Sequence, residues 1–423
     1  VVVHHDALRL RFGRAESGWR QWYGTPPSRP LLAFEDLSAL PTAERAARVE
    51  ARCADAQAGM DLAAGPLLRA LLFRCGPADH RFFIAIHHLV VDGVSWWVLM
   101  DDLWTAYRDL ARGTPVHLPD RTAPVREWVS RLREYAGSET LRASFDGFLA
   151  APFHRAGALP VDFPGGGNTV ALEATVKVEL TADETEALLR QAPTAYRCEI
   201  NDLLLTALGL ALCEWSGCAA HMVDVEGHGR EPLFEDVDPS RTVGWFTSIC
   251  PRLLDVGDTP EPLAALRRVK EHLRSLPHHG IGFGVAYFLG DEALRGRLAS
   301  LPPREVCFNY MGRFDGASGA PRAEESCGPT RHPAQERGYL LELNGHIADA
   351  VLQFEFGYSR GMHAPGTIQA VAHRFHEVLR GFVAEAAVVR ERASTPSDFP
   401  LANLTQAQLE KLLRRFSAPA TTD

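Results

Sequence analysis

The stretch RFFIAIHHLVVDGVSWWVLMDDLWTAY runs from Arg81 to Tyr107, and the rest of the chain is organised around it. It opens on an apolar run, Phe82 to Ile86, that is too short for a free-standing helix and is bounded by a turn signal, so it predicts a buried strand. The run stops at His87 and His88. Because successive strand side chains point to opposite faces, only one imidazole can face a given cavity. We expect one of the two histidines to be functional and the other to be packed or hydrogen-bonded in support of it.

The same stretch continues into a helix. Asp92-Gly93 is a tight-turn dipeptide, and Ser95 is a candidate N-cap for an amphipathic helix over residues 96–110. A lone histidine at a strand end is more often a satisfied core residue than a catalyst. In an HHxxxDG run, however, the histidines, the aspartate and the glycine each have a separate role where the strand turns into the helix, and this favours a functional site.

Several stretches resemble the motifs of one protein family. HHLVVDGVSW is similar to the HHxxxDGxSW signature of the condensation-domain superfamily of nonribosomal peptide synthetases. VDVEGHGREP (223–232) and RTVGWFTSICP (241–251) resemble the motif pair that marks epimerization domains within that superfamily. Three later stretches agree, namely GIGFGVAYFL (280–289), CFNYMGRFD (307–315) and SDFPLANLTQAQL (397–409). The resemblance covers nearly the whole chain, from about His4 to Leu409.

The resemblance implies an α+β fold of the chloramphenicol-acetyltransferase type, a two-lobed pseudo-dimer with an active-site tunnel between the lobes. The segment HRAGALPVDFPGGGN (154–168) holds two prolines and three consecutive glycines, which makes it the best candidate for a linker. We therefore expect an N-terminal lobe over 1–165 with the HHxxxDG motif and a C-terminal lobe over 166–423 with the EGHGRE motif. Family members carry a helix and a strand before the HHDALRLRF segment, so we expect the N-terminal lobe to lack its first helix and strand.

Hydrophobic patterning predicts the other elements. Helices are predicted over 43–60, 123–135, 140–149, 201–215, 260–276 and 368–386. Strands are predicted over 67–73, antiparallel to 82–88, and over 169–180, 221–225, 306–310 and 339–357, the last with a turn at Asn344-Gly345. Thr181 and Glu184 form a capping-box pattern at the start of another helix.

Composition bounds the class of protein. The 423 residues suggest two or three domains, and 46% hydrophobic and 23% charged residues are typical of a soluble globular protein. The net charge of -9 argues against nucleic acid as a partner, and no apolar run approaches the roughly 20 residues that span a bilayer. The eight cysteines form no CxxC pair, and no Cys/His group has zinc spacing. We expect a reduced, cytoplasmic protein without a metal, a signal peptide or a membrane segment.

The resemblance also implies a chemistry. The substrate would be an aminoacyl or peptidyl thioester on the 4'-phosphopantetheine arm of a carrier domain, with no cofactor bound by this domain itself. The implied partners are the peptidyl carrier (thiolation) domain of the same synthetase and adjacent synthetase modules. Epimerization removes the Cα proton and returns it to the other face, which requires an acid/base pair around a planar carbon and hydrogen-bond donors for the enolate oxygen.

His88 and Glu226 are the expected catalytic pair, one from each lobe. His88 is the second histidine of its motif, the position that carries the catalytic role in the family, and its imidazole titrates near neutrality. Glu226 stands at a predicted strand end before Gly227, so its side chain can enter a cavity. In an unrelated sequence an exposed turn carboxylate would be the better interpretation, but the EGHGRE string favours the catalytic one. Which of the two is the base for each enantiomer stays open.

Other residues are expected to support the site. Asn309 and Tyr310 match a family position near the site and can donate a hydrogen bond to the enolate, although a half-buried strand tyrosine is an equally good interpretation of Tyr310. Trp245 is expected to line the tunnel, with core packing as the competing interpretation.

Asp92 is structural in the family rather than catalytic. Here we expect it to pair with Arg9, so that the two hold the corner rigid, with His87 and Gly93 part of the same support.

Two alternatives remain beside epimerization, a condensation domain and a docking module, and a third, a pyridoxal-phosphate racemase, is excluded by its lysines. HHxxxDG alone is shared with condensation domains that form a peptide bond between carrier-bound substrates, although EGHGRE and the NYMG stretch favour epimerization. A non-catalytic docking module usually loses the histidine motif, which is intact here. A pyridoxal-phosphate racemase needs a buried Schiff-base lysine, and the three lysines, Lys177, Lys270 and Lys411, lie in a polar strand, a charged helix and a terminal helix.

Overall fold

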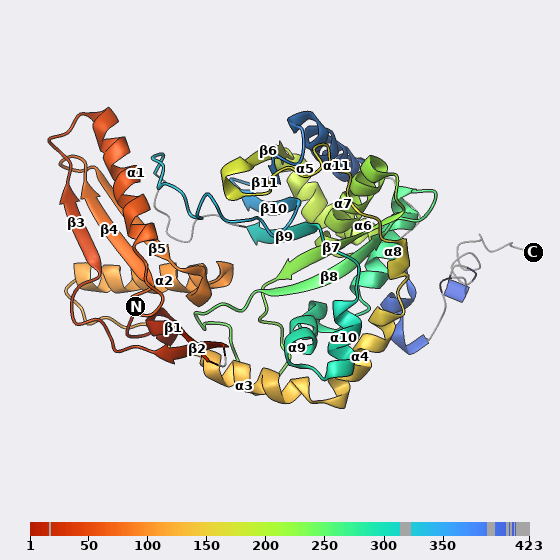
Figure 1. Cartoon of the computed structure of the whole chain (residues 1–423), viewed down its shortest axis with the longest axis horizontal. Helices are drawn as coiled ribbons and strands as arrows, with labels where there is room; N and C mark the ends of the chain where they lie inside the picture. The colour runs from red at the N-terminus through yellow and green to blue at the C-terminus, as the bar shows by residue number, and fades with distance from the viewer. Residues whose placement is uncertain are drawn as a thin grey trace, which may run out of the picture. The chain divides into compact units, whose positions relative to one another are not determined.

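The computed structural model describes residues 1–16, 18–313, 323–386, 394–402, 406, 408, 409 and 411. Contacts between Cα atoms divide the chain into two compact units (Figure 1). Unit 1 comprises Val1–Arg133, His228–Thr247 and Gly316–Gln335, and unit 2 comprises Glu134–Gly227, Ser248–Asp315 and Glu336–Asp423. Residues 314 and 315 of the CFNYMGRFD stretch and residues 403–405 and 407 of the SDFPLANLTQAQL stretch lie outside the described residues.

The division differs from the boundary expected at 165/166. Residues 134–165 belong to unit 2, because helix α4 (Glu139–Leu149) buries Phe145 and Phe148 against Phe283 of helix α9 (Gly282–Leu289). The EGHGRE motif is itself divided, since Gly227 ends one stretch of unit 2 and His228 begins a stretch of unit 1. A boundary drawn at one point of the sequence cannot describe units built from interleaved stretches.

Unit 1 contains a hairpin and a three-stranded sheet in the order β3-β4-β5. Strand β5 pairs antiparallel with β4, as predicted, and β3 pairs parallel with β4. Helix α1 packs on one face around Val49, Cys53 and Phe73, and helix α2 packs Val98 and Leu99 on a second cluster. The elements of unit 1 are η1 (Asp6–Arg9), β1 (Leu10–Ala15), β2 (Gly18–Tyr23), β3 (Leu32–Asp36), α1 (Thr42–Ala58), β4 (Leu68–Arg74), β5 (His80–Ile86), η2 (His88–Val90), α2 (Gly93–Ala111) and α3 (Val125–Ala136), the last of which ends beyond the division.

Two later stretches of the chain complete unit 1. In the stretch 228–247, the ring of Phe234 lies 5.3 Å from that of Trp128. In the stretch 316–335, both carboxylate oxygens of Glu325 accept from Arg81 Nε, at 2.8 and 2.9 Å. The backbone carbonyl of Cys327 accepts from the side chain of Gln57 on α1. These stretches therefore belong to unit 1 by side-chain contacts as well as by backbone proximity.

Unit 2 is built on a six-stranded sheet in the order β6-β11-β10-β9-β7-β8. Strand β9 runs parallel to both of its neighbours, and the other pairs are antiparallel. Figure 1 shows α7 and α11 beside this sheet, where they bury its apolar face. The elements of unit 2 not yet given are η3 (Phe153–Arg155), η4 (Val170–Leu172), β6 (Glu173–Glu179), α5 (Ala182–Glu186), η5 (Ala187–Gln191), α6 (Ala192–Tyr196), α7 (Ile200–Ser216), β7 (Ala220–Gly227), β8 (Ser248–Asp255), α8 (Pro262–Leu273), η6 (His278–Gly280), α10 (Glu292–Ala299), β9 (Val306–Arg313), β10 (Leu341–Ala348), β11 (Val351–Ser359), α11 (Pro365–Ala386), η7 (Pro396–Asp398) and η8 (Pro400–Ala402).

The predicted turn at Asn344-Gly345 is wrong. Both residues lie inside β10, and the chain reverses at Asp349 and Ala350, whose φ angles are 50° and 65°. Two consecutive residues at positive φ are typical of a tight hairpin turn. A Cβ on Gly345 would lie 2.3 Å from the ring of Phe354, so this glycine allows close packing inside the sheet.

Helix caps give one confirmed and one wrong prediction. Thr181 and Glu184 form the predicted capping box at the start of α5. The N-cap of α2 is Asp92 rather than Ser95, because Asp92 Oδ1 accepts from the backbone N–H of Ser95 at 2.8 Å. The capping carboxylate satisfies one of the helix's unpaired N–H groups.

Lys270 is fully buried in unit 2. Its Nζ donates to the backbone carbonyl of Arg197 and to Asp398 Oδ2, both at 2.6 Å. Asp398 also accepts from the backbone N–H of Thr395. The segment around Asp398 is thereby fixed to α8 by a buried ion pair, and the lysine that the sequence places in a charged helix is engaged in the fold.

His272 gives unit 2 a predicted sensitivity to acid. Burial among Phe148 and Phe153, followed by the charge of Arg252, lowers the pKa of His272 from 6.5 to about 3. Below pH 6.5 this histidine is protonated in the unfolded chain but not in the folded chain, so the free energy of unfolding falls as the pH falls. Between pH 7.5 and 5 this histidine should lower the free energy of unfolding by about 2 kcal/mol. We expect His272→Phe to reduce the pH dependence of the unfolding free energy by that amount, and an unchanged pH dependence in denaturant titrations would contradict it.

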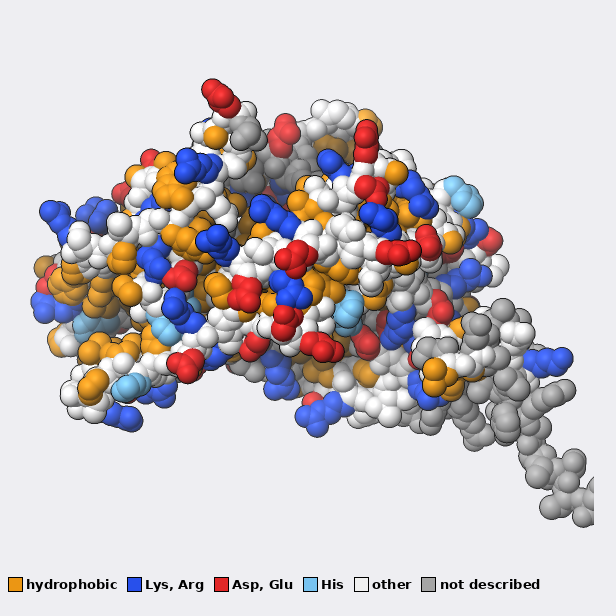
Figure 2. All heavy atoms as spheres, turned by 90° about the horizontal axis from the view of Figure 1, so that it is seen from below, with side chains coloured by type: hydrophobic (Ala, Val, Ile, Leu, Met, Phe, Trp, Pro, Cys, Tyr) orange, Lys and Arg blue, Asp and Glu red, His pale blue; other side chains and the backbone are white. Residues whose placement is uncertain are grey.

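On the face drawn in Figure 2, basic and acidic side chains are interspersed. Among the described residues, we find no helix that combines the length and the apolar character needed to cross a bilayer.

Candidate functional site

The two histidines of the first motif lie just beyond the end of β5. Strand β5 stops at Ile86, so the side chains are placed by a short 3-10 turn, η2, and not by strand alternation. His87 is half-buried, and its Nδ1 accepts from the backbone N–H of Leu89 at 3.2 Å. Burial, followed by the charge of His88, lowers the pKa of His87. His87 is therefore a half-buried residue with a local backbone hydrogen bond, and its supporting role stays a prediction.

His88 is exposed, and its ring lies beside an aromatic residue of the second motif pair. The centroids of the His88 and Trp245 rings are 5.4 Å apart. Trp245 is itself 50% exposed, whereas the next residue, Phe246, is buried. Both His88 and Trp245 belong to unit 1. Unit 1 thus presents an accessible imidazole against an accessible indole.

Asp92 is buried, and its partner is Arg230. The two side chains are 2% and 5% exposed, and Arg230 Nη1 and Nη2 donate to the two oxygens of Asp92 at 2.6 and 3.0 Å. The carboxylate also accepts from the hydroxyl of Ser95 at 2.7 Å and from the backbone N–H of Phe246 at 2.9 Å. Asp92 therefore joins the HHxxxDG corner to both the EGHGRE and the RTVGWF motifs.

The expected pairing of Asp92 with Arg9 is wrong. Arg9 donates instead to the carboxylate of Asp6 and to the backbone carbonyls of Val2 and Val3. These are local contacts within the first nine residues, and Arg9 is the last residue of the HDALR segment (5–9). The correct partner is the arginine of EGHGRE, whose pairing with Asp92 no single motif could reveal.

The two glycines near this network differ in their roles. Gly93 is the first residue of α2, and a Cβ there would meet no atom within 4 Å, so sterics do not require glycine at the position expected to support the site. Gly229 of EGHGRE has φ 67°, and a Cβ there would lie 1.7 Å from the carbonyl oxygen of Phe246. Glycine is therefore required at 229, which lets the backbone approach the RTVGWF segment closely.

Glu226 lies near the end of β7 in unit 2, half-buried. The thiol of Cys307, on the neighbouring strand β9, donates to Glu226 Oε1 at 3.6 Å. Burial, followed by the charge of Glu226, raises the pKa of Cys307, so the thiol stays protonated as a donor. This contact between Cys307 and Glu226 was not predicted from the sequence. The position of Cys307 directly before Phe308-Asn309 could have indicated it.

The two residues expected to stabilise the enolate lie on opposite faces of the sheet. Asp224 pairs in register with Cys307, so continuing the ladder places Asn309 beside Glu226 on the same face. Tyr310 faces the other way, where it packs on the apolar core with its ring 6.4 Å from that of Phe354. By register Asn309 therefore lies beside Glu226, whereas Tyr310 fits the half-buried strand tyrosine that was its other interpretation.

A second polar group supports β7 from the same face. Asp224 is two residues before Glu226, and its Oδ2 accepts from the Tyr339 hydroxyl at 2.9 Å. Arg304 lies 3.2 Å from Asp224 Oδ1. Burial raises the pKa of Asp224, against the opposing effect of Arg304. This network fixes the strand that carries Glu226.

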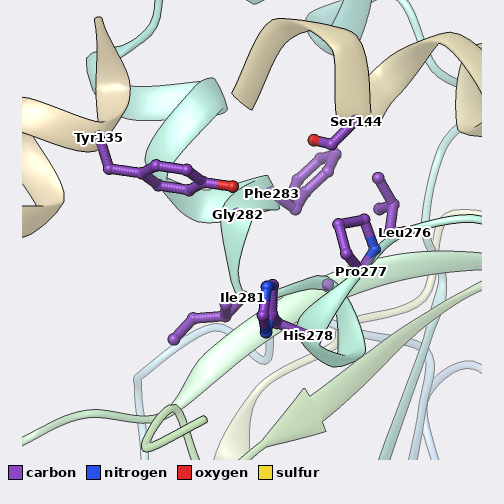
Figure 3. Close-up of a pocket in the computed structure, with 9 residues that line it drawn as sticks. Tyr135, Ser144, Leu276, Pro277, His278, Ile281, Gly282 and Phe283 are labelled. Carbon is purple, nitrogen blue, oxygen red and sulfur yellow. The ribbon is translucent and has the colours of Figure 1, made fainter. Parts of the chain in front are cut away.

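A small pocket lies elsewhere in unit 2 (Figure 3). It is a narrow depression between α4, the end of α3 and the loop before α9, and Figure 3 shows Tyr135, Ser144 and Phe283 around it. None of the predicted site residues lines it. Its lining has no carboxylate or thiol, and its titratable side chains are Tyr135 and His278.

One group of side chains has the composition of a metal site. His4, His5 and Asp102 have candidate ligand atoms within 4.8 Å of one another. Asp102 Oδ2 is hydrogen-bonded to His5 Nε2 at 2.7 Å, and Asp102 Oδ1 accepts from Arg241 at 2.6 Å. Both carboxylate oxygens are thus engaged, and the guanidinium already neutralises the charge that would attract a cation.

Comparison with known sequences gives a family match over most of the chain. The family model described as Condensation domain matches residues 1–405. One of the proteins that make up linear gramicidin synthase from Brevibacillus parabrevis is 42% identical over 98% of this chain, and chondramide synthase cmdD from Chondromyces crocatus is 41% identical over 99%. The chain spans only 5% and 11% of the lengths of these two relatives.

Solved structures share the fold. The crystal structure of the epimerization domain from the third module of tyrocidine synthetase B has a TM-score of 0.82 and 33% identity, covering 91% of this chain and 86% of that one. The first condensation domain of the calcium-dependent antibiotic synthetase has a TM-score of 0.65 and 19% identity, covering 92% and 87%. The second likeness concerns the fold alone.

Proposed function

Because this chain belongs to the condensation-domain family, with the α+β fold that its motifs predicted, we propose that it epimerizes the Cα of an aminoacyl or peptidyl thioester. The substrate would be carried on the phosphopantetheine arm of a carrier domain, with the carrier and adjacent synthetase modules as partners. The large synthetases among its relatives support a carrier-bound substrate, since this chain matches a small part of each.

The observation that carries the proposal is the placement of Glu226. This carboxylate lies at the end of β7 on the polar face of the sheet, beside Asn309 and in contact with the Cys307 thiol. An acid/base residue for proton transfer at carbon needs such a fixed carboxylate with hydrogen-bond donors near it. The 33% identity to an epimerization domain, which exceeds the 19% to the condensation domain, favours the same function.

The proposed reaction is a pair of proton transfers. One member of the pair His88 and Glu226 removes the Cα proton, and the C–H electrons move into the thioester carbonyl to form an enolate. The thioester favours this step because it acidifies Cα without the permanent negative charge of a carboxylate. Asn309 donates a hydrogen bond to the enolate oxygen, and the other member of the pair returns a proton to the opposite face.

The roles of the remaining residues follow from their contacts. Trp245 lies beside the His88 ring, where it can contact the substrate. Asp92, with Arg230, holds the corner that carries His88, and acts through position rather than by touching the substrate. No cofactor enters this scheme.

Cα proton exchange tests the proposal directly. An L-aminoacyl carrier domain is incubated with the protein in deuterated water, and deuterium uptake and chirality are followed by mass spectrometry and chiral analysis. We expect exchange with approach to a mixture of L and D forms. Amide formation without exchange, once an acceptor aminoacyl carrier is added, would instead identify a peptide-bond-forming condensation domain.

The condensing activity is the second candidate, because the HHxxxDG motif and the exposed His88 suit either reaction. A docking module without catalysis is the third. It predicts neither exchange nor amide formation, although the carrier would still bind. A carrier-binding measurement alongside the two reaction assays therefore separates all three.

A further inference from the structure

A row of side chains crosses the sheet of unit 2 from Glu226. In the neighbouring strand β9, Asn309 continues the row by register, and Asn309 is paired with Asn344 of β10. Asn344 is in turn paired with Glu355 of β11, and Glu355 with Lys177 of β6. Residues paired across strands share one face of the sheet. The row is therefore carboxylate, amide, amide, carboxylate and ammonium, each on its own strand.

The ends and the middle of this row differ. Lys177 Nζ lies 3.2 Å from Glu355 Oε1, so the two residues at the end of the row distant from Glu226 form an ion pair. Asn309 and Asn344 make no side-chain hydrogen bond to any other described residue. Asn309 is half-buried and Asn344 is exposed. Within the described part of the chain, two carboxamides without a side-chain partner thus lie side by side next to Glu226.

The fold does not explain the amide at position 344. The residue constrained by packing at this point of β10 is Gly345, because a Cβ there would clash with the ring of Phe354. The Asn344 side chain lies on the opposite, polar face, where it contributes nothing to the apolar core. Asparagine is also disfavoured in strands relative to β-branched residues. An asparagine here is therefore better explained by what it binds.

The two carboxamides of the row suit one chemical group. Neighbouring strands lie about 4.8 Å apart, which is too close for a third amide to lie in line between the two side chains, but a group that lies across their tips can reach both. Each carboxamide offers both a donor and an acceptor. A secondary amide has both a C=O and an N–H, so it can accept from one carboxamide and donate to the other. A thioester or an ester lacks the N–H and cannot use both.

We propose that Asn344, together with Asn309, binds a secondary amide of the substrate and positions its Cα beside Glu226. This inference rests on the proposed function and specifies the substrate of that same site. Asn344 binds substrate without taking part in the proton transfers. Asn309, which lies between Asn344 and Glu226, serves both the amide and the enolate.

Two parts of a carrier-bound substrate contain a secondary amide. A peptidyl group has the amide that acylates its α-nitrogen, close to the reacting carbon, whereas an aminoacyl group has a free amine there. The pantetheine arm has amides of its own, whatever it carries. The same chemistry therefore has two sources, and a pair of substrates distinguishes them.

The test compares kcat/KM for Cα exchange on two loaded carriers, one aminoacyl and one N-acylated to form a peptidyl group. We expect Asn344→Ala to lower kcat/KM by about 10-fold on the peptidyl carrier, because a hydrogen bond is lost and the substrate amide is left unsatisfied. An unchanged value on the aminoacyl carrier identifies the peptidyl amide as the ligand. An equal loss on both carriers identifies the pantetheine arm. No loss on either carrier overturns the proposal.

Gln353→Ala is the matched control. Gln353 is a carboxamide on the same polar face, paired with His346 and thus outside the row of Glu226. We expect its kcat/KM to equal that of the wild type on both carriers. Asn344→Asp preserves the shape of the side chain but removes the N–H donor, so it should reproduce the loss if Asn344→Ala fails to fold. A loss in Gln353→Ala equal to that in Asn344→Ala would contradict a site confined to the row.

Binding separates this proposal from the proposed function. A carrier loaded with a non-hydrolysable thioether analogue of the peptidyl substrate, which adds no N–H at the position of the thioester, reports affinity without chemistry. Failure of the wild type to exchange protons would refute epimerization. In that case, about 10-fold weaker binding in Asn344→Ala, with Gln353→Ala unchanged, still supports the amide site, and equal affinity in all three proteins refutes it.

Discussion

Replacing Glu226 with glutamine is expected to lower kcat for Cα exchange by about 10²–10⁴-fold, the usual contribution of general acid–base catalysis. Glutamine preserves the size of the side chain and can still contact the Cys307 thiol across β7 and β9, but it cannot accept a proton from carbon. The loss should appear in kcat, because the substrate amide remains free to bind to Asn344. Deuterium uptake on a loaded carrier measures it.

Glu355→Gln is the matched control for this change. Glu355 lies on the same face of the same sheet and in the same row, but its partner is Lys177. The same chemical replacement there should leave exchange near the wild-type rate. If Glu226→Gln exchanged as fast as Glu355→Gln while both proteins remained folded, Glu226 would have no acid/base role.

Asp92→Asn should destabilise unit 1 by about 3–5 kcal/mol, the cost of leaving a buried charge without its partner. Arg230 is 5% exposed, and the amide would oppose its guanidinium with a donor where the carboxylate had offered only acceptors. The backbone N–H of Phe246 would also lose a charged acceptor. We expect a lower denaturation midpoint and faster amide hydrogen exchange in residues 241–247.

Arg9→Met is the control that distinguishes the two possible partners of Asp92. Arg9 contacts Asp6 and two backbone carbonyls, so its loss should cost about 1 kcal/mol or less. A large destabilisation by Arg9→Met together with a small one by Asp92→Asn would contradict the pairing of Asp92 with Arg230. Any activity lost in Asp92→Asn should follow the loss of folded protein, which a catalytic role would not require.

Local patterns of the sequence predicted most elements of the fold. The apolar run over 201–215 became the buried helix α7, and the strand pair 67–73 with 82–88 became β4 and β5. The turn in the last hairpin was missed because Asn344-Gly345 has the composition of a turn, whereas Asp349-Ala350 does not. Packing against Phe354 explains the glycine, and packing is not visible in local sequence.

Long-range partners were harder to predict than elements. Asp92 was expected to pair with an arginine, but its partner lies 138 residues away in the chain, and arginines are numerous. The orientation of Tyr310 was predictable, however. The alternation that was applied to His87 and His88 applies equally to Asn309 and Tyr310, which lie within one strand and must face opposite sides.

The interleaved make-up of unit 1 limits how such a chain can recombine. Its three stretches are separated in the gene by stretches that encode unit 2. A single crossover between two homologous genes, anywhere from 134 to 227, would inherit Asp92 from one parent and Arg230 from the other. These two residues form one buried pair, so such a hybrid keeps the pair only if its two parents carry compatible residues at positions 92 and 230. Exchange of the whole chain as one cassette avoids that conflict.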